Sequence, residues 1–164
     1  MGSYRYGKDH ICAWIRANVP SDASVLDVGP CDGIWQRMLP EYRMDACEIF
    51  EPNARACDPL YRTVYCCDIA DLEYDHYDLV IFGDVIEHME VRKAQHVLAY
   101  AEAHCHDIIV AVPWLYRQGE LYGNQWERHI QDDLTEQLYE ERYPGFTQIW
   151  RSNEYAYYHK RGKT

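Results

Sequence analysis

The sequence has no long apolar run. None of its stretches approaches the roughly 20 residues that a membrane-spanning helix needs. The opening sequence MGSYRYGKDH also lacks the apolar centre of a secretory signal peptide. We therefore expect no contact with a membrane and a cytoplasmic location. A length of 164 residues fits a single domain, residues 1–164, with room for a sizeable core.

Paired cysteines and an excess of basic charge are missing as well. The seven cysteines include no CxxC pair, which argues against a disulfide framework or a zinc knuckle. Sixteen basic residues stand against 27 acidic ones, and the net charge of −11 would repel a phosphate backbone. The composition therefore disfavours nucleic acid as a partner, and it specifies no oligomeric state.

Short apolar runs that alternate with helical patterns are what the sequence does contain. Such alternation is typical of βαβ units and a parallel sheet. Apolar residues at helical spacing predict a helix over about 89–104, and a helical segment is expected within residues 1–20. The five apolar runs, each predicted to be a strand, are residues 23–29, 44–50, 61–67, 77–83 and 107–113.

The pattern changes after residue 113. Residues 113–131 are polar and aromatic, and a long loop of this kind in a compact domain is usually functional, so we expect it to cover a substrate. A helix is predicted over about 132–142, capped by Asp132 or Asp133. A turn signal at Ser152-Asn153 predicts a final hairpin, so at least one of the last two strands is antiparallel.

A glycine turn follows the first predicted strand. The strand ends at Asp27-Val28, Gly29 and Gly33 come next, and a helix is expected from about Ile34. A strand, a tight turn and a helix N-terminus together form a cradle for a nucleotide.

Acidic residues follow the next two predicted strands. Glu48 lies nineteen residues after Gly29, where a carboxylate can accept hydrogen bonds from both ribose hydroxyls. Asp68 is placed to accept from an adenine amino group, with Ile69 stacking on the ring. Cys31 occupies the position of the middle glycine of a dinucleotide fingerprint, which weakens NAD as a candidate. S-adenosylmethionine has an adenosine and no phosphate, and it imposes no such requirement.

Four segments resemble the motifs of class I S-adenosylmethionine-dependent methyltransferases: VLDVGPCDG, CEIFEP, CCDIADL and YDLVIFGDVIEHM. The resemblance covers the chain almost end to end. It implies an α/β fold, a three-layer Rossmann-like sandwich with a mostly parallel seven-stranded sheet of order 3-2-1-4-5-7-6 whose last strand is antiparallel. It also implies S-adenosylmethionine as cofactor, bound by Asp27, Gly29, Pro30, Gly33, Glu48, Ile49, Asp68, Ile69, Gly83 and Asp84.

Methyl transfer from a sulfonium mainly requires donor and acceptor to be held in line in a dry pocket, and a base only where the acceptor carries a proton. The candidate catalytic residues are His129, in the covering loop, together with His88 and Glu87 after the fourth strand.

These residues also raise the question of a metal. If the backbone becomes helical at residue 84, then Asp84, Glu87 and His88 share one face and could converge with His129 on a divalent ion such as Mn²⁺ or Mg²⁺. The stretch resembles the acid-x-x-Glu-His motif of the metal-dependent ubiquinone-pathway O-methyltransferases and small-RNA 2′-O-methyltransferases. Metal-independent relatives also carry Glu-His at this place, so a structural role is favoured over a metal.

The remaining aromatic and imidazole groups carry weaker signals. Tyr4 and Tyr6 are candidates to close over the cofactor. Four aromatic residues of the covering loop are expected to form either a wall around a flat acceptor or a small cluster of their own: Trp114, Tyr116, Tyr122 and Trp126. Six scattered histidines are expected to be solvent-exposed or capping: His10, His76, His96, His104, His106 and His159.

The favoured function is therefore methyl transfer from S-adenosylmethionine to an oxygen or nitrogen of a small-molecule acceptor. Two alternatives stay open. One is a metal-assisted RNA 2′-O-methyltransferase, which would need a basic groove. The other is a non-catalytic protein that binds S-adenosylmethionine.

Overall fold

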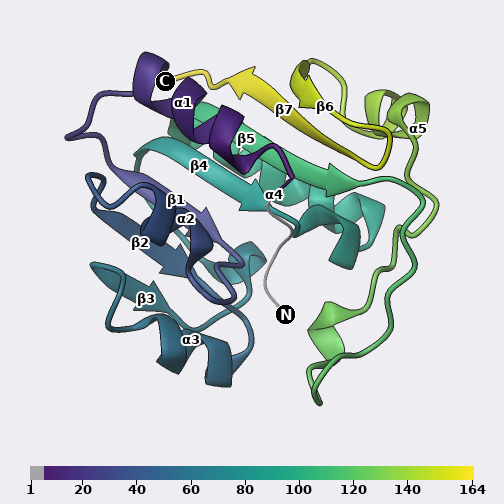
Figure 1. Cartoon of the computed structure of the whole chain (residues 1–164), viewed down its shortest axis with the longest axis horizontal. Coiled ribbons are helices and arrows are strands. Elements are labelled where there is room, and N and C mark those ends of the chain that lie inside the picture. The colour runs from purple at the N-terminus through teal and green to yellow at the C-terminus, as the bar shows by residue number, and fades with distance from the viewer. Residues whose placement is uncertain (1–5) are drawn as a thin grey trace.

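The computed structural model describes residues 6–164, so Tyr4 lies outside the described residues. One mixed sheet runs through the molecule in the order β3-β2-β1-β4-β5-β7-β6 (Figure 1). Its strands are β1 (Val25–Val28), β2 (Met44–Cys47), β3 (Thr63–Tyr65), β4 (Tyr77–Gly83), β5 (Cys105–Pro113), β6 (Thr147–Arg151) and β7 (Tyr155–Arg161).

The pairing of the strands confirms the predicted topology. The pairs β2–β3, β1–β2, β1–β4 and β4–β5 are parallel, whereas β7 runs antiparallel to both of its neighbours, β5 and β6. The seven-stranded order 3-2-1-4-5-7-6 and the antiparallel last strand are both as expected.

Helices cover both faces of the sheet and complete three layers (Figure 1). On one face, α1 (Lys8–Asn18), α2 (Ile34–Met38) and α3 (Glu51–Cys57) contribute to the core that contains Leu79 and Ile81 of β4. On the other, α4 (Val91–His104) and α5 (Glu136–Arg142) contribute to the core that contains Val80 and Phe82. Because successive side chains of a strand point to opposite faces, the unbroken apolar run of β4 supplies both cores.

The helix boundaries follow local chemistry. The helix predicted over 89–104 is α4, and its stripe of Ala94, Val97, Leu98 and Ala101 is buried as expected. The predicted cap of the later helix is wrong. Helix α5 begins after Thr135, whose side-chain oxygen accepts from the Leu138 N–H at 3.2 Å. Asp133 instead pairs with Arg142 in the last turn. No helix among residues 6–164 is long and apolar enough to cross a bilayer.

A buried lysine connects three elements at one end of the sheet. Lys8, at the start of α1, is fully buried, and its ammonium lies 3.7 Å from Asp84 Oδ2, just beyond β4. The same Nζ donates to the Tyr157 hydroxyl at 3.3 Å and lies 4.7 Å from the centre of a Trp35 ring. Tyr155 of β7 donates its hydroxyl proton to the other oxygen of Asp84. The contacts among Lys8, Asp84, Tyr155 and Tyr157 thus join α1, the end of β4 and β7.

We expect Lys8→Met to lower the free energy of unfolding by about 3–5 kcal/mol, because it leaves the Asp84 carboxylate partly buried without its cation. The double variant Lys8→Met/Asp84→Asn should recover much of this loss, since it removes both charges. Urea unfolding of Lys8→Met, Asp84→Asn and the double variant measures the coupling energy between the two side chains. Additivity within about 0.5 kcal/mol would mean that the pair does not stabilise the fold.

Candidate active site

A cavity of about 960 Å³ opens at the carboxyl ends of the parallel strands. This is the edge at which open α/β sheets bind their ligands. The segment from Trp114 to Ile130, between β5 and α5, supplies the opposite wall. In Figure 1 it is the green stretch that continues from β5 and descends on the right of the view. Seven of the ten predicted cofactor residues line the cavity: Gly29, Glu48, Ile49, Asp68, Ile69, Gly83 and Asp84.

The turn after β1 depends on left-handed backbone. Gly29 has φ +67°, and a Cβ there would lie 2.7 Å from Val85 Cγ2, so no larger residue fits without a shift. Cys31 also adopts a left-handed conformation, with φ 51°, and its N–H donates to Glu48 Oε2 at 3.3 Å. The cysteine thus takes a backbone conformation that glycine would adopt more easily.

Glu48, directly after β2, is fixed by backbone donors. The Phe50 N–H donates to Oε1 at 2.9 Å, and the Cys31 N–H binds the other oxygen. Burial raises the pKa of Glu48, and these two donors oppose that rise. The carboxylate keeps acceptor capacity on the cavity wall, because each oxygen has two lone pairs.

Asp68 has a partner that sequence patterns did not indicate. Its Oδ1 accepts from the Ala70 N–H at 3.0 Å, and its Oδ2 forms an ion pair with Lys93 of α4. Lys93 lines the same cavity. The charge of Asp68 is therefore balanced beside the predicted adenine position.

Asp27, Pro30 and Gly33 do not line the cavity. Asp27 is fully buried beneath the turn, where Oδ2 accepts from the Tyr61 hydroxyl at 2.6 Å. Its Oδ1 has no hydrogen-bond partner among the described residues. Burial raises the pKa of Asp27 to about 7. Asp27 therefore supports the glycine turn from below and does not reach the cavity.

The expectation that Asp84, Glu87 and His88 share one helical face is wrong. Asp84 has φ 61°, and the 3₁₀ turn η2 (Ile86–His88) begins only two residues later. The left-handed residue turns the Asp84 carboxylate toward Lys8 and Tyr155, away from a shared ligand set. The cluster that could hold an ion consists of Glu87, His88 and His129, without Asp84.

His88 and His129 meet although they are 41 positions apart in the sequence. Their ring centres are 4.6 Å apart, and the ligand atoms of Glu87, His88 and His129 all lie within 4.8 Å of one another. His88 Nδ1 lies 3.1 Å from the Arg128 carbonyl, and His129 Nδ1 lies 2.8 Å from the Tyr116 carbonyl. Because a carbonyl oxygen only accepts, each Nδ1 carries the proton and each Nε2 offers a lone pair.

Burial sets the charge of this cluster. Burial, and then the neighbouring charge of Asp84, raise the pKa of Glu87 well above its ordinary value. Neither Glu87 oxygen has a hydrogen-bond partner among the residues that the structure describes. Burial lowers the pKa of His88. Burial and the neighbouring His88 lower the pKa of His129 to about 4. Both imidazoles are therefore neutral at neutral pH and able to accept a proton or bind a cation.

Gln131 holds the covering segment against η2, a role that sequence reasoning missed. Its Nε2 donates to the carbonyls of Ile86 and Met89 at 2.7 and 3.0 Å. The backbone N–H groups of Ile130 and Gln131 both donate to the Glu87 carbonyl at 2.9 Å. These bonds bring His129 to His88. No spacing rule links a glutamine in a loop to carbonyls more than forty positions earlier.

Three of the four loop aromatics line the cavity, namely Trp114, Tyr116 and Trp126. Tyr122 is 81% exposed and lies outside it. Trp114 also packs edge-on against the core residues Tyr139 and Tyr158, so one ring of the wall is anchored. Tyr6, predicted to close over the cofactor, lies on the cavity wall.

The chain matches no protein-family model and no curated protein sequence. Its structure is similar to that of Burkholderia thailandensis 1,6-didemethyltoxoflavin-N1-methyltransferase with bound 1,6-didemethyltoxoflavin and S-adenosylhomocysteine, at 20% identity and a TM-score of 0.70 over 97% of this chain and 79% of that one. Magnesium protoporphyrin IX methyltransferase from Synechocystis PCC 6803 with bound SAM has a TM-score of 0.65 at 16% identity, over 99% and 86% of the two chains.

An S-adenosylmethionine-dependent methyltransferase from Clostridium acetobutylicum ATCC 824 has a TM-score of 0.72 at 14% identity, over 98% of this chain and 93% of that one. Together with the sheet order, these similarities show that the chain has the Rossmann-like fold of class I S-adenosylmethionine-dependent methyltransferases.

We expect Asp27 to make the protein less stable as the pH rises. Its pKa is raised in the folded state, so its stabilising contribution is complete below the unfolded value near 4 and is lost as the pH rises through about 7. Asp27→Asn cannot titrate and should show a flatter profile between pH 4 and pH 7. Urea unfolding at several pH values measures this. Parallel profiles for the two proteins would contradict a buried, protonated Asp27.

Proposed function

We propose that the chain is a single methyltransferase domain that transfers a methyl group from S-adenosylmethionine to an oxygen or nitrogen of a small-molecule acceptor. The observation that carries the proposal is the convergence on one cavity of two sets of groups. The turn at Gly29, Glu48 and Asp68 come from successive strand ends, and His129 faces them from the covering segment.

The strand side of the cavity suits an adenosine. The Glu48 carboxylate would accept from the ribose hydroxyls, Asp68 from the adenine amino group, and Ile69 would contact the ring. The left-handed turn at Gly29 would let backbone approach the methionine part of the cofactor. Gly83 leaves no room for a side chain, since a Cβ there would lie 2.5 Å from Trp35 Nε1.

The loop side suits the acceptor. An acceptor lone pair forms a bond to the methyl carbon as the carbon–sulfur bond breaks, and the bonding pair goes to sulfur, leaving S-adenosylhomocysteine. Where the acceptor is a hydroxyl or a protonated nitrogen, its proton would pass to His129 Nε2, which is neutral and unprotonated because Nδ1 donates to Tyr116. Glu87 and His88 would brace the floor beneath His129.

Three observations favour a small acceptor. The acidic composition, with a net charge of −11, opposes a polyanion such as RNA. The cavity lies at the upper end of the roughly 300–1,000 Å³ common for small-molecule sites, and aromatic rings form part of its wall. Two structural neighbours are named for small-molecule substrates, 1,6-didemethyltoxoflavin and magnesium protoporphyrin IX.

Glu48 provides the sharpest test of the cofactor side. We expect Glu48→Ala to weaken S-adenosylhomocysteine binding by about tenfold or more, since ribose hydroxyls would lose a charged acceptor worth about 1.5–3 kcal/mol. Isothermal titration calorimetry measures this. Glu51→Ala is the matched control, because Glu51 is exposed on α3 and pairs with Arg55. Equal affinity of wild type and Glu48→Ala would remove Glu48 from the binding site.

The Glu87, His88 and His129 cluster favours a second candidate, a metal-assisted methyltransferase. Two Nε2 lone pairs and a buried carboxylate without a hydrogen-bond partner fit a divalent transition ion, and the two Nδ1–H groups bound to carbonyls resemble the outer contacts of metal-binding histidines. A bound ion would act as a Lewis acid toward an acceptor oxygen.

One assay distinguishes the two candidates. A panel of phenols and nitrogen heterocycles is screened for S-adenosylhomocysteine release with wild type, His129→Ala and the exposed control His96→Ala. With His129 as base, His129→Ala should lose about 10²-fold or more in rate and retain cofactor affinity, and EDTA should change nothing.

The opposite result would be loss of methyl transfer on EDTA treatment, with Mn²⁺ restoring transfer in wild type and not in His129→Ala. That result would favour the metal-assisted methyltransferase over His129 as a general base. Cofactor binding with no transfer to any acceptor, including RNA ends, would favour a non-catalytic binding protein.

A further inference from the structure

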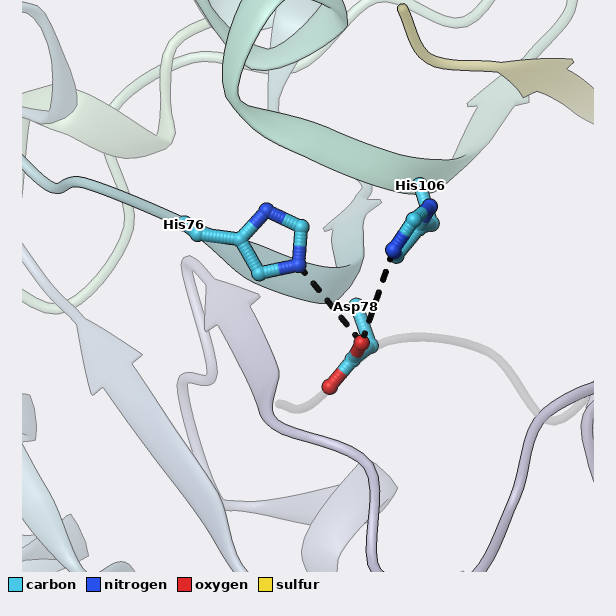
Figure 2. Close-up of side chains that lie close together, drawn as sticks. All are labelled: His76, Asp78 and His106. Atoms are coloured by element: carbon cyan, nitrogen blue, oxygen red, sulfur yellow. Dashed lines mark ion pairs between the residues drawn. The ribbon is translucent and has the colours of Figure 1, made fainter. Parts of the chain in front are cut away.

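A second group of metal-ligating side chains lies at the opposite end of the sheet. His76 precedes β4, Asp78 lies within it, and His106 lies at the start of β5 (Figure 2). None of the three lines the cavity described above. The sequence suggests only exposed or capping roles for His76 and His106, which are thirty positions apart.

Strand geometry explains why they meet. Residues two positions apart on extended chain point to the same side, which places His76 beside Asp78. The register of β4 and β5 pairs Tyr77 with Cys105 and Leu79 with Asp107, so His106 lies next to Asp78. All three side chains therefore emerge on one side of neighbouring parallel strands.

The distances between the three ligand atoms are close to those around a tetrahedrally coordinated ion. Asp78 Oδ1 lies 3.5 Å from His76 Nε2 and 4.0 Å from His106 Nε2, the two ion pairs drawn in Figure 2. The three ligand atoms all lie within 4.8 Å of one another. Bonds of about 2.0–2.1 Å to Zn²⁺ set tetrahedral ligand atoms roughly 3.3 Å apart. Small side-chain rotations would bring the three groups to that spacing.

Asp78 is held in place for this role. Its Oδ2 accepts from the Ser24 N–H at 2.7 Å and from the Ser24 hydroxyl at 2.8 Å, which leaves Oδ1 toward the imidazoles. The two bonds from Ser24 are thus outer contacts of the kind that orients a metal ligand.

The imidazoles are free to bind. Their rings contact each other edge-on with centres 4.9 Å apart, and among the described residues neither has a hydrogen-bond or ion-pair partner other than Asp78. The side chains are 39% and 50% exposed, so an ion would keep an open position for water. Two nitrogen donors and one carboxylate favour Zn²⁺, Co²⁺ or Ni²⁺ over Mg²⁺ and Ca²⁺.

We propose that His76, Asp78 and His106 form a binding site for a divalent transition ion of the Zn²⁺ class, separate from the site of methyl transfer. The ion would join the segment before β4 to the start of β5 and so stabilise the amino-terminal end of the sheet.

Zinc titration of the full chain, stripped of metal with EDTA, tests the proposal. The other cluster is first disabled by His88→Ala/His129→Ala. In that background we expect about one equivalent of Zn²⁺ to bind by calorimetry, and no Mg²⁺. Adding His76→Ala or His106→Ala should weaken Zn²⁺ binding at least about tenfold, whereas adding the exposed control His96→Ala should change nothing.

Thermal unfolding gives a second measurement in the same background. Free Zn²⁺ at a hundredfold excess over Kd should raise Tm by roughly 5 °C or more, and the added His76→Ala/His106→Ala pair should abolish this rise. Absence of Zn²⁺ binding, or equal affinity with and without the two imidazoles, would show that the three side chains form only a surface ion-pair cluster. Cofactor affinity is independent of either outcome.

Discussion

The site depends on one buried charge pair, the Lys8 ammonium and the Asp84 carboxylate. A cation without water is costly unless a counter-ion and further donors or acceptors surround it. Lys8 meets this condition only where α1, β4 and β7 come together, because Asp84, Trp35 and Tyr157 all contact its Nζ. The position of α1 and the direction of the chain after β4 are thereby set by the same interaction.

The charge of Asp84 also determines the chemistry next to it. This charge adds to burial in raising the pKa of Glu87. Because Asp84 has a left-handed backbone, the 3₁₀ turn that carries Glu87 and His88 begins only at Ile86. Gln131 then fastens the covering segment to that turn, which brings His129 to His88. The Lys8–Asp84 pair, the turn η2 and the covering segment thus together position Glu87, His88 and His129 at the cavity floor.

The sequence allowed the architecture to be predicted because local signals encode it. Apolar runs and a helical stripe predicted the alternating strands and helices, and the resemblance of the strand-end motifs to class I methyltransferases implied the sheet order that the structure has. Seven of the ten expected cofactor residues line the cavity. What could not be predicted depends on contacts between distant residues: Lys93 with Asp68, Gln131 with η2, and His76 with His106. Asp84 was misplaced because the helical spacing assumed for it fails at a residue with positive φ.

The central claim is that the strand-end cavity takes an adenosine-containing methyl donor, and calorimetric titration of the wild-type chain tests it most directly. S-adenosylhomocysteine and NAD are titrated separately into the same preparation, and S-adenosylmethionine is used as a competitor. We predict that S-adenosylhomocysteine binds in a single class of sites, more tightly than NAD, and that S-adenosylmethionine displaces it. No binding of S-adenosylhomocysteine, or tighter binding of NAD, would contradict the account.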